Sequence, residues 1–404
     1  MKNLKLLRIT TVPVSLKTLL KGQHRFMSEK GFEVVGVSSP GKQLGEVESL
    51  EGIRTVPLEM TRTVSPVKDL RSLWRFYRLC KKVKPTIVHS HTPKAGIVGM
   101  LGARLAGVPI RLHTVAGLPL METSGVKRRV LDVVEKLTYR CATMVYPISM
   151  GLKDFIIAQR YTKSEKLKII GNGSSNGFNS QYFDPMLFRE ENNVELRRSL
   201  QLGEDDFVFV FVGRLVGDKG INELIEGFKR CVSQDAWGRA VRLLLVGDFE
   251  HELDPLLSET LKEIEKNQHV HFVGYQQDVR PYLAISDALV FPSYREGFGN
   301  VVAQAGLMGL PSIVTDITGC NEIIVEGENG TIIPPKDALA LEAAMRRFLE
   351  EPEYVAQLAK NARPMITSRY EQQIFWDALL EEYQRLLKEK GIEFTPCTKH
   401  TPNA

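Results

Sequence analysis

The chain has 404 residues, 43% of them hydrophobic and 25% charged, and its net charge is +5 at pH 7. This length is too great for one ordinary core and suits two compact domains. The sequence near Met1 lacks the apolar core of a signal peptide, and no run of about 18 uncharged apolar residues occurs, so we expect a soluble protein that is not exported. Five cysteines without a C-x-x-C spacing argue against a disulfide framework or a zinc site and favour the reducing cytoplasm.

The charge is divided unevenly along the chain. Residues 1–180 contain 30 Lys and Arg against 12 Asp and Glu, a net charge of +18, whereas residues 181–404 contain 23 against 36, a net charge of −13. Such a basic half favours an anionic partner. No basic strand carries the interleaved aromatic residues of nucleic-acid-binding proteins, so we expect a membrane surface rather than DNA or RNA. The alternative is an ordinary solvated basic face.

Short apolar runs alternate with helix-length amphipathic segments along the whole chain. The runs expected as strands are 5–9, 33–37, 86–89, 110–114 and 144–147 in the first half, and 207–212, 242–246, 271–272, 288–291 and 312–315 in the second. Near-continuous apolar strands separated by helices predict a parallel sheet covered on both faces, with ligands at the carboxyl ends of the strands. Two such series predict an α/β protein with two doubly wound, Rossmann-like domains facing a cleft.

Turn-rich and polar segments between residues 171 and 193 mark the domain boundary. We therefore assign residues 1–185 to the first domain and residues 186–370 to the second. Apolar residues at helical spacing between Ile374 and Leu387 predict a terminal helix over residues 371–391. The polar residues 392–404 are expected to be a disordered tail.

A phosphate-binding turn is predicted where the apolar strand 207–212 ends. Two glycines and two cations follow the strand, and a helix is expected to begin near Asn222: Gly213, Arg214, Lys219 and Gly220. Glycines let backbone N–H groups approach a phosphate, and a helix N-terminus favours negative charge. The two cations can add charge-assisted hydrogen bonds to a leaving diphosphate. A surface turn with two solvated cations is the alternative.

A second ligand-binding segment is predicted after the strand 288–291. Glu296 lies at the carboxyl edge of this strand, and Gln304 lies about one turn into the helix that follows. The backbone between them can donate N–H groups to a ligand, from Gly297, Phe298, Gly299 and Asn300. The alternative is a structural acid that caps a helix.

Together with segments 88–96, 104–109, 169–173, 246–248 and 273–275, these two motifs resemble family 4 of the retaining glycosyltransferases. The resemblance covers about Leu4 to Leu387. It implies the two-domain GT-B fold, with an acceptor-binding N-terminal domain, a nucleotide-sugar-binding C-terminal domain, and a C-terminal helix that crosses back to pack on the N-terminal domain. Within the family, the chain resembles bacterial enzymes that extend a sugar on an undecaprenyl diphosphate carrier during capsule, O-antigen or glycoprotein glycan assembly.

The resemblance also implies roles for individual residues. Arg214 and Lys219 match the diphosphate-binding pair of the family, and Glu296 matches the first acid of its paired-acid motif, near the donor sugar hydroxyls. These three are the catalytic candidates. The second acid of that motif, a ribose ligand, is replaced here by Gln304. Its amide still offers an acceptor to a hydroxyl, so we expect donor binding to persist in altered strength.

The acceptor side departs from the family pattern. Many relatives carry a histidine at the position of Ala116, and the nearby candidates for this side are His113, Thr114 and Glu122. At the end of the first strand, residues 10–15 replace the paired glycines of many relatives, and Ser15 is a further candidate there. A histidine at the end of an apolar strand is more often packed in the core, and the enzyme can also do without such a group. Residues 14–27 mix apolar and basic side chains and suit a membrane interface, with a helix packed on its own sheet as the alternative.

The sequence therefore predicts transfer of a sugar from a nucleotide diphosphate donor, with UDP preferred, to a lipid-linked acceptor at the inner face of the cytoplasmic membrane. Because no Asp-x-Asp stands in a suitable strand-end loop, we expect fixed cations to stabilise the leaving group without metal or any other cofactor. The alternatives are a catalytically impaired donor-binding partner subunit, motivated by Ala116 and Gln304, and a GT-B sugar-nucleotide epimerase. The sequence leaves the sugar and the oligomeric state open.

Overall fold

The computed structural model describes residues 4–61, 65–118, 123–233, 237–250 and 254–397. The chain divides into two compact units, one formed by Met1–Gly177 with Gln372–Ala404 and the other by Phe178–Glu371. This division falls earlier in the chain than the expected boundary at residue 185. Within the described ranges, none of the helices is both long and apolar enough to span a bilayer.

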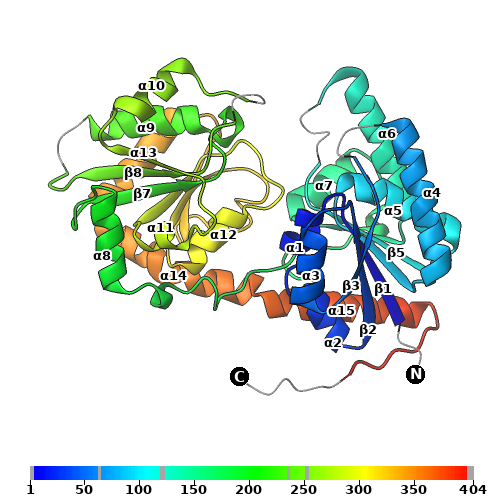
Figure 1. Cartoon of the computed structure of the whole chain (residues 1–404). Coiled ribbons are helices and arrows are strands. Elements are labelled where there is room, and N and C mark those ends of the chain that lie inside the picture. The colour runs from blue at the N-terminus through cyan, green and yellow to red at the C-terminus, as the bar shows by residue number, and fades with distance from the viewer. Residues whose placement is uncertain (1–3, 62–64, 119–122, 234–236, 251–253, 398–404) are drawn as a thin grey trace. The chain divides into compact units, whose positions relative to one another are not determined.

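Unit 1 is built on a parallel six-stranded sheet with the strand order β3-β2-β1-β4-β5-β6 (Figure 1). Its strands are β1 (Leu4–Ile9), β2 (Phe32–Ser38), β3 (Arg54–Pro57), β4 (Ile87–Ser90), β5 (Ile110–Val115) and β6 (Met144–Pro147). Sequence reasoning missed β3, a short edge strand in which every side chain is at least partly exposed and no apolar run exists.

Helices cover both faces of this sheet. On one face lie α4 (Pro66–Val83), α5 (Pro93–Ala106) and α6 (Gly125–Cys141), and on the other lie α1 (Pro13–Leu19), α2 (Gln23–Glu29) and α3 (Gln43–Glu51) (Figure 1). After β6 the chain continues into α7 (Met150–Ala158). The carboxyl ends of all six strands share one edge, because the strands are parallel.

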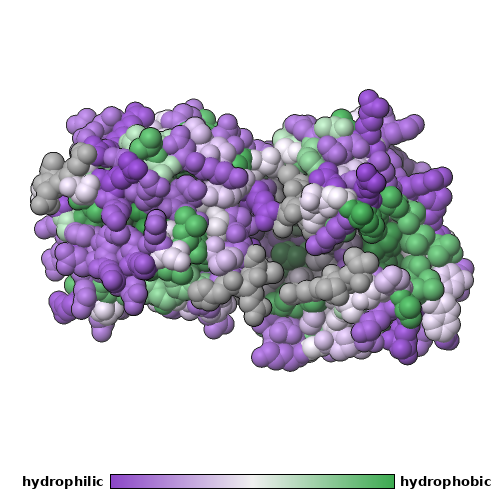
Figure 2. Space-filling view, turned by 90° about the horizontal axis from the view of Figure 1, so that it is seen from above, coloured by the Kyte–Doolittle hydropathy of each residue, from purple (hydrophilic) through white to green (hydrophobic). Residues whose placement is uncertain are grey.

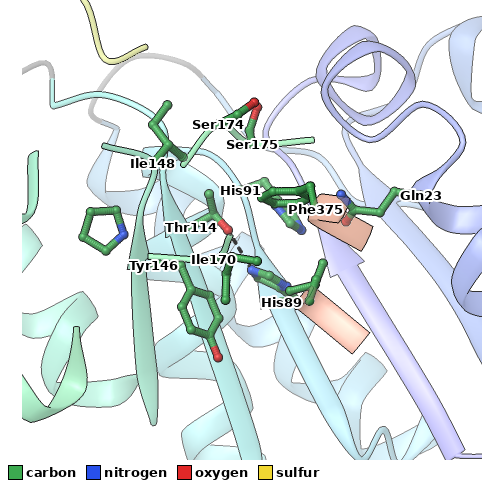
Figure 3. A pocket seen from close by; sticks show the side chains of 12 residues that line it. Gln23, His89, His91, Thr114, Tyr146, Ile148, Ile170, Ser174, Ser175 and Phe375 are labelled. Carbon is green, nitrogen blue, oxygen red and sulfur yellow. Dashed lines mark hydrogen bonds between the residues drawn. The ribbon is translucent and has the colours of Figure 1, made fainter. Parts of the chain in front are cut away.

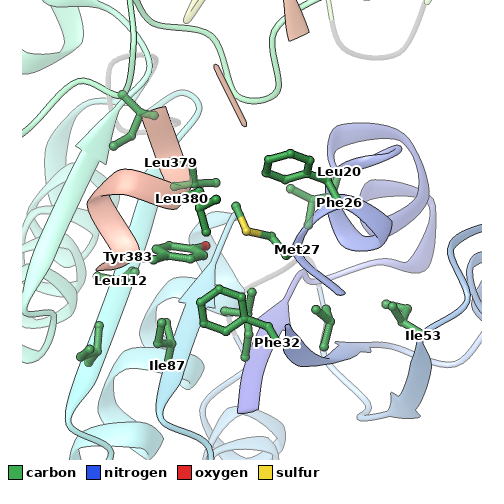
Figure 4. Packing of buried hydrophobic residues seen from close by; sticks show 14 of the residues in the cluster. Leu20, Phe26, Met27, Phe32, Ile53, Ile87, Leu112, Leu379, Leu380 and Tyr383 are labelled. Atoms are coloured by element: carbon green, nitrogen blue, oxygen red, sulfur yellow. The ribbon is translucent and has the colours of Figure 1, made fainter. Parts of the chain in front are cut away.

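The C-terminal helix α15 (Gln372–Glu389) belongs to unit 1 and completes its core. Leu379 and Tyr383 of α15 pack with Phe32 of β2 and Phe26 of α2 (Figure 4). Each such side chain, once fully buried, stabilises the fold by roughly 1.5–3 kcal/mol. Polar contacts add to this packing, since the Tyr383 hydroxyl lies 2.6 Å from Nδ1 of His89.

Two expectations about unit 1 differ from the structure. In residues 14–27, Leu16 and Leu20 are fully buried and Phe26 nearly so, and the side chain of Lys17 pairs with Glu46 at 2.6 Å. Most apolar residues of this segment therefore pack in the core of unit 1 and are not available to a membrane, whereas Val14 is 41% exposed. The prediction of a disordered tail that begins at Ile392 is also wrong for residues 392–397, because these residues lie against α2 and β2.

The contacts of that tail are specific. The ring of Phe394 lies 4.4 Å from that of Phe32, and the Cys397 amide donates to the Lys30 carbonyl at 3.1 Å. The remaining part of the expected tail, residues 398–404, lies outside the described residues.

Unit 2 repeats the architecture with a parallel sheet in the order β12-β11-β10-β7-β8-β9 (Figure 1). Its strands are β7 (Phe207–Val212), β8 (Val241–Val246), β9 (Val270–Gly274), β10 (Ala288–Phe291), β11 (Ser312–Thr315) and β12 (Gly330–Ile333). Sequence reasoning missed the edge strand β12. All six residues of β7 are buried, as expected for a central strand covered on both faces.

The helices of unit 2 also form two layers. One layer holds α9 (Ile221–Val232), α10 (Ser258–Lys266) and α13 (Ala338–Glu350), and the other holds α12 (Asn300–Leu307) and α14 (Pro352–Tyr370) (Figure 1). Two further helices are α8 (Glu190–Ser199) and α11 (Arg280–Ala284).

Candidate active site

A glycine brings two strand ends of unit 2 into direct contact. Gly220 has φ +71°, and a Cβ atom built on it would lie only 2.1 Å from the carbonyl oxygen of Pro292, the residue after β10. Only glycine tolerates both the left-handed backbone and this approach. The turn after β7 is thereby held against the loop after β10, and Gly220 is also the N-cap of α9.

This approach joins two of the three catalytic candidates, Lys219 and Glu296. The Lys219 ammonium forms an ion pair with Oε1 of Glu296, and the Ser293 hydroxyl donates to the same oxygen at 3.2 Å. Both charged side chains are largely buried, at 16% and 17% exposed. The pair is therefore screened little by water and sits at the carboxyl edge of the sheet, beside the N-terminus of α9.

Three further contacts hold the loop after β10 against the turn and helix that follow β7. The Arg295 guanidinium lies 2.5 Å from a carboxylate oxygen of Asp218, and the Tyr294 amide donates to the Asp218 carbonyl at 2.9 Å. The Tyr294 hydroxyl donates to Glu223 at 2.6 Å. Sequence reasoning assigned no role to these residues, which position the neighbouring Lys219 and Glu296.

Arg214 lines a cavity of about 440 Å³ at the carboxyl ends of β7, β8 and β9. This volume is in the range of small-molecule sites. The Arg214 side chain is 54% exposed and pairs with Glu250. The rest of the lining includes glycines, an acid, an aromatic ring and an amide, from Gly213, Gly247, Asp248, Tyr275 and Gln276.

Asp248 and Tyr275 of this lining are joined directly, since the Tyr275 amide donates to an Asp248 carboxylate oxygen at 3.0 Å. Both residues belong to segments that resembled the family, 246–248 and 273–275, but no role was assigned to them from the sequence. Their signal was the same one that identified Arg214: a strand that ends in glycine, followed by polar residues.

The segment before α12 differs in part from the expectation. The Phe298 ring is buried and packs against Tyr370 at 5.3 Å, so this side chain belongs to the core. The Gly299 amide donates to the Gly319 carbonyl and the Asn300 amide to the Phe298 carbonyl. These two N–H groups are therefore occupied within the protein, so the prediction of backbone donors toward a ligand is kept only for Gly297 and Phe298.

Gln304 lies in α12 and is half-buried. It follows the N-terminus of this helix by about one turn, as the sequence predicted. Its role toward a ribose remains a prediction.

Unit 1 has a polar pocket of its own at the carboxyl edge of its sheet (Figure 3). Its lining includes Thr114, Ser174 and Ser175 together with His89 and His91. The internal cavity of about 10 Å³ has room for roughly one water molecule. Thr114 is the acceptor-side candidate that the structure places here, and its hydroxyl lies 2.8 Å from Nε2 of His89.

His91 is the most distinctive group in this pocket. It is 3% exposed, and among the described residues neither of its ring nitrogens has a hydrogen-bond partner. Burial is the main reason that the pKa of His91 lies well below 6.5, and repulsion from His89 and Arg8 lowers this pKa further. The Arg8 side chain is fully buried and donates hydrogen bonds to two neutral groups: the Gln23 amide oxygen and, at 3.4 Å, the Tyr383 hydroxyl. The neutral His91 can accept or donate a hydrogen bond at the pocket.

The other acceptor-side candidates lie elsewhere. His113 is packed against Gly96 of α5, within 2.8 Å of the Ser90 hydroxyl, and burial lowers its pKa to about 4. It is therefore a core histidine, on the opposite face of the sheet from His89. Ser15 lies in the first turn of α1, where its amide donates to the Val12 carbonyl at 3.1 Å. Glu122 lies outside the described residues.

Comparison with known proteins identifies the family from which this arrangement comes. The family described as "Glycosyl transferases group 1" matches residues 192–365, and the "Glycosyl transferase 4-like domain" matches residues 23–173. The "Capsular polysaccharide biosynthesis glycosyltransferase CapM" of Staphylococcus aureus is 36% identical over 96% of this chain and 99% of its own length. The chain belongs to the family 4-like glycosyltransferases of group 1.

Two further comparisons concern a relative and a solved structure that share less sequence identity with this glycosyltransferase. The Escherichia coli "UDP-Gal:alpha-D-GlcNAc-diphosphoundecaprenol alpha-1,3-galactosyltransferase" is 30% identical over 77% of this chain and 78% of its own. Among solved structures, that of Anabaena Alr3699/HepE in complex with UDP and glucose superposes with a TM-score of 0.78 at 20% identity, covering 95% of this chain and all of the other. The fold of the glycosyltransferase is thus GT-B, as predicted.

Proposed function

We propose that this glycosyltransferase moves a sugar, with retention of anomeric configuration, from a nucleotide diphosphate donor to a polyprenyl diphosphate-linked glycan at the inner face of the cytoplasmic membrane. UDP-sugars are the preferred donors. The observation that carries the proposal is the pairing of Lys219 with Glu296 at the same carboxyl edge of the unit 2 sheet as the cavity lined by Arg214.

The two charged residues have complementary tasks toward the donor. A diphosphate carries more negative charge than one carboxylate, so it competes with Glu296 for the Lys219 ammonium. The displaced carboxylate can then accept hydrogen bonds from hydroxyls of the donor sugar. Arg214, already paired with the acid Glu250, can turn its guanidinium to the same diphosphate.

Leaving-group stabilisation supplies most of the catalysis in this proposal. As the bond between the anomeric carbon and the diphosphate oxygen breaks, negative charge grows on that oxygen, and fixed cations bind the transition state more tightly than the ground state. The acceptor hydroxyl forms the new bond on the same face of the sugar. Its proton passes to the departing phosphate, which makes nucleoside diphosphate the second product.

The choice of substrates rests on the relatives. The Escherichia coli relative is named for a UDP-linked donor and a diphosphoundecaprenol-linked acceptor, and the Staphylococcus aureus relative is named for capsular polysaccharide biosynthesis. The first name supports a carrier-linked acceptor, and the second supports a role in cell-surface polysaccharide assembly. Thr114 of unit 1 stays a candidate for the acceptor side, although it and His91 are buried around a cavity with room for about one water molecule.

A panel of nucleotide sugars, with and without lipid-linked acceptor, tests the proposal through release of nucleoside diphosphate. Release that depends on both donor and acceptor, with the anomeric configuration retained in the product, is the expected result. A donor that raises the melting temperature but releases nothing would indicate the catalytically impaired partner subunit. Interconversion of the donor sugar without acceptor would indicate an epimerase.

A further inference from the structure

The outward faces of α4 and α6 combine large apolar side chains with basic ones. In α4, Val67, Leu70 and Trp74 are 84%, 66% and 55% exposed. Their spacing of three and four residues places them in one row along the helix. The same outward side of α4 carries exposed basic residues: Lys68, Arg71, Arg78, Lys81 and Lys82. The inward side is occupied by Ser72, Phe76 and Cys80.

The helix α6 repeats this pattern. Its exposed apolar residues are Val126, Val130, Val133 and Leu137, again at helical spacing. Basic residues alternate with them at the surface: Lys127, Arg129, Lys136 and Arg140. These three valines and one leucine are exposed and so are not part of the core of unit 1. We call the exposed residues of α4 and α6 together the α4–α6 face.

The acidic residues of these helices are turned away from this face. Asp69 is paired with Lys94 at 2.5 Å, Asp132 accepts from the Tyr161 hydroxyl and from Arg128, and Glu135 is buried. The helix between them, α5, contains no Asp or Glu and adds an exposed Leu105. The α4–α6 face is therefore apolar and uniformly basic.

The two rows lie on the same side of unit 1. The helix α5 packs against both α4 and α6, and all three cover one face of the sheet (Figure 1). On the side of unit 1 where Figure 1 places α4 and α6, Figure 2 shows apolar residues gathered among hydrophilic ones.

We propose that the α4–α6 face docks this glycosyltransferase on an anionic lipid bilayer. Apolar side chains beside a tryptophan enter the boundary between headgroups and acyl chains, and flanking Lys and Arg side chains extend along them toward the lipid phosphates. The inference rests on the proposed lipid-linked acceptor, because such an acceptor stays in the bilayer. It replaces residues 14–27, which are packed on the sheet, as the membrane-facing part of the chain.

The charge of the face favours a bilayer over a second copy of the chain. In a two-fold dimer formed through this face, the basic residues of one copy would meet those of the other, and like charges repel. Anionic headgroups offer the opposite charge across the whole face. Pairing with the acidic unit 2 of another copy is the competing outcome that the test must detect.

Vesicle co-sedimentation tests the inference without any catalytic step. The protein should bind vesicles that contain phosphatidylglycerol and ignore vesicles of phosphatidylcholine alone, and binding should fall as salt shortens the Debye length from about 10 Å at 0.1 M toward about 3 Å at 1 M. Charge reversal in Arg71→Glu/Arg129→Glu should weaken binding by about tenfold or more. Leu70→Ser/Trp74→Ser should weaken it without changing its dependence on anionic lipid.

Matched variants on the opposite face of the same sheet serve as controls. Leu50 of α3 is 53% exposed and Lys42 precedes that helix, so Leu50→Ser and Lys42→Glu each make one change of the same kind away from the α4–α6 face. Both should bind vesicles as the unaltered protein does. Loss of binding in the controls equal to that in the test variants would overturn the assignment.

Fluorescence provides a readout that does not depend on a destabilised variant. The chain has three tryptophans, so the Trp74 signal is the difference between the unaltered protein and Trp74→Phe. Its emission should move to shorter wavelength on anionic vesicles as the indole leaves water. An unchanged Trp74 signal would overturn the inference. So would a protein that does not bind vesicles but forms a concentration-dependent dimer that Trp74→Ser abolishes.

The two proposals can fail separately. Turnover on a lipid-linked acceptor in detergent without vesicle binding would leave the proposed function intact and reject the docking face. Vesicle binding through the α4–α6 face without any transfer to a lipid-linked acceptor would reject the proposed function instead.

Discussion

Lys219→Ala is expected to lower kcat with little effect on the KM of the acceptor. The ammonium of Lys219 is largely buried against Glu296, so its field is screened little by solvent and acts strongly on charge that develops nearby. It contributes most when negative charge accumulates on the departing diphosphate. The substitution therefore removes an interaction that strengthens between the ground state and the transition state.

The size of the effect follows from this environment. A hydrogen bond to a charged group contributes roughly 1.5–3 kcal/mol, and one preorganised donor to a developing oxyanion contributes about 2.7–4 kcal/mol. At about 1.4 kcal/mol per factor of ten, we expect kcat to fall by roughly a hundredfold to a thousandfold. Arg214→Ala should cost less, because the Arg214 side chain is 54% exposed.

Lys229→Ala is the matched control. Lys229 lies in the last turn of α9, the helix that follows Lys219, and its ammonium pairs with Glu263 at 2.8 Å, but its side chain is 62% exposed. The charge change is identical and the distance from the strand edge is greater. Steady-state kinetics with saturating donor, followed by release of nucleoside diphosphate, should show the loss for Lys219→Ala and near-normal turnover for Lys229→Ala.

Two results would refute this reasoning. Equal turnover in the two variants would show that Lys219 acts only through overall charge. A loss confined to acceptor affinity would remove Lys219 from the donor site. Combining Lys219→Ala with Glu296→Gln adds a further check, since the double variant should lose less than the sum of the single losses if the two side chains act as a pair.

Three other predictions address the donor site and the fold. Gln304→Leu should weaken donor binding by about 1–3 kcal/mol, because it leaves a buried ribose hydroxyl of the donor unpaired, whereas Gln304→Glu should be tolerated. Equal donor affinities of the unaltered protein and both variants, measured by calorimetry, would remove Gln304 from the site. Activity should persist in excess EDTA, and its loss with recovery on adding magnesium would reveal a required metal. Burial raises the pKa of Glu135 from 4.5 to about 7, so folding takes up a proton between these values and stability falls as pH rises through them. Glu135→Gln should then raise the free energy of unfolding by about 3 kcal/mol above pH about 8 and have little effect below pH about 5. Denaturant titrations at the two pH values measure this, and equal gains at both would contradict the prediction.

Much of the site's location was predictable because strand ends have local signals. An apolar run that ends in glycine, followed by cations or an acid, predicted the loops that carry Arg214, Lys219 and Glu296, and parallel topology places such loops at one edge. The pairing of Lys219 with Glu296 was not predictable, because it depends on the neighbouring positions of β7 and β10 in the sheet order. The residues are 77 positions apart in the chain.

The histidines of unit 1 show the same limit at the level of single side chains. Successive side chains of a strand point to opposite faces, so the sequence determines that Ser90 and His89 face different layers but not which layer contains the pocket. The register pairs Ser90 with His113, which places His113 toward α5 and α6, whereas His89 faces the helix α15.

The sequence by itself thus determined the two α/β units, the strands with apolar runs, and the loops that carry charge, because each depends on residues close together in the chain. Only the tertiary structure decided what covers each apolar face. The helix α15 and residues 14–27 have similar amphipathic patterns to α4 and α6, yet the first two are packed on the sheet and the last two leave apolar residues exposed. Periodicity identifies an apolar side chain and its direction, but the neighbour that buries it, or fails to, comes from distant parts of the chain.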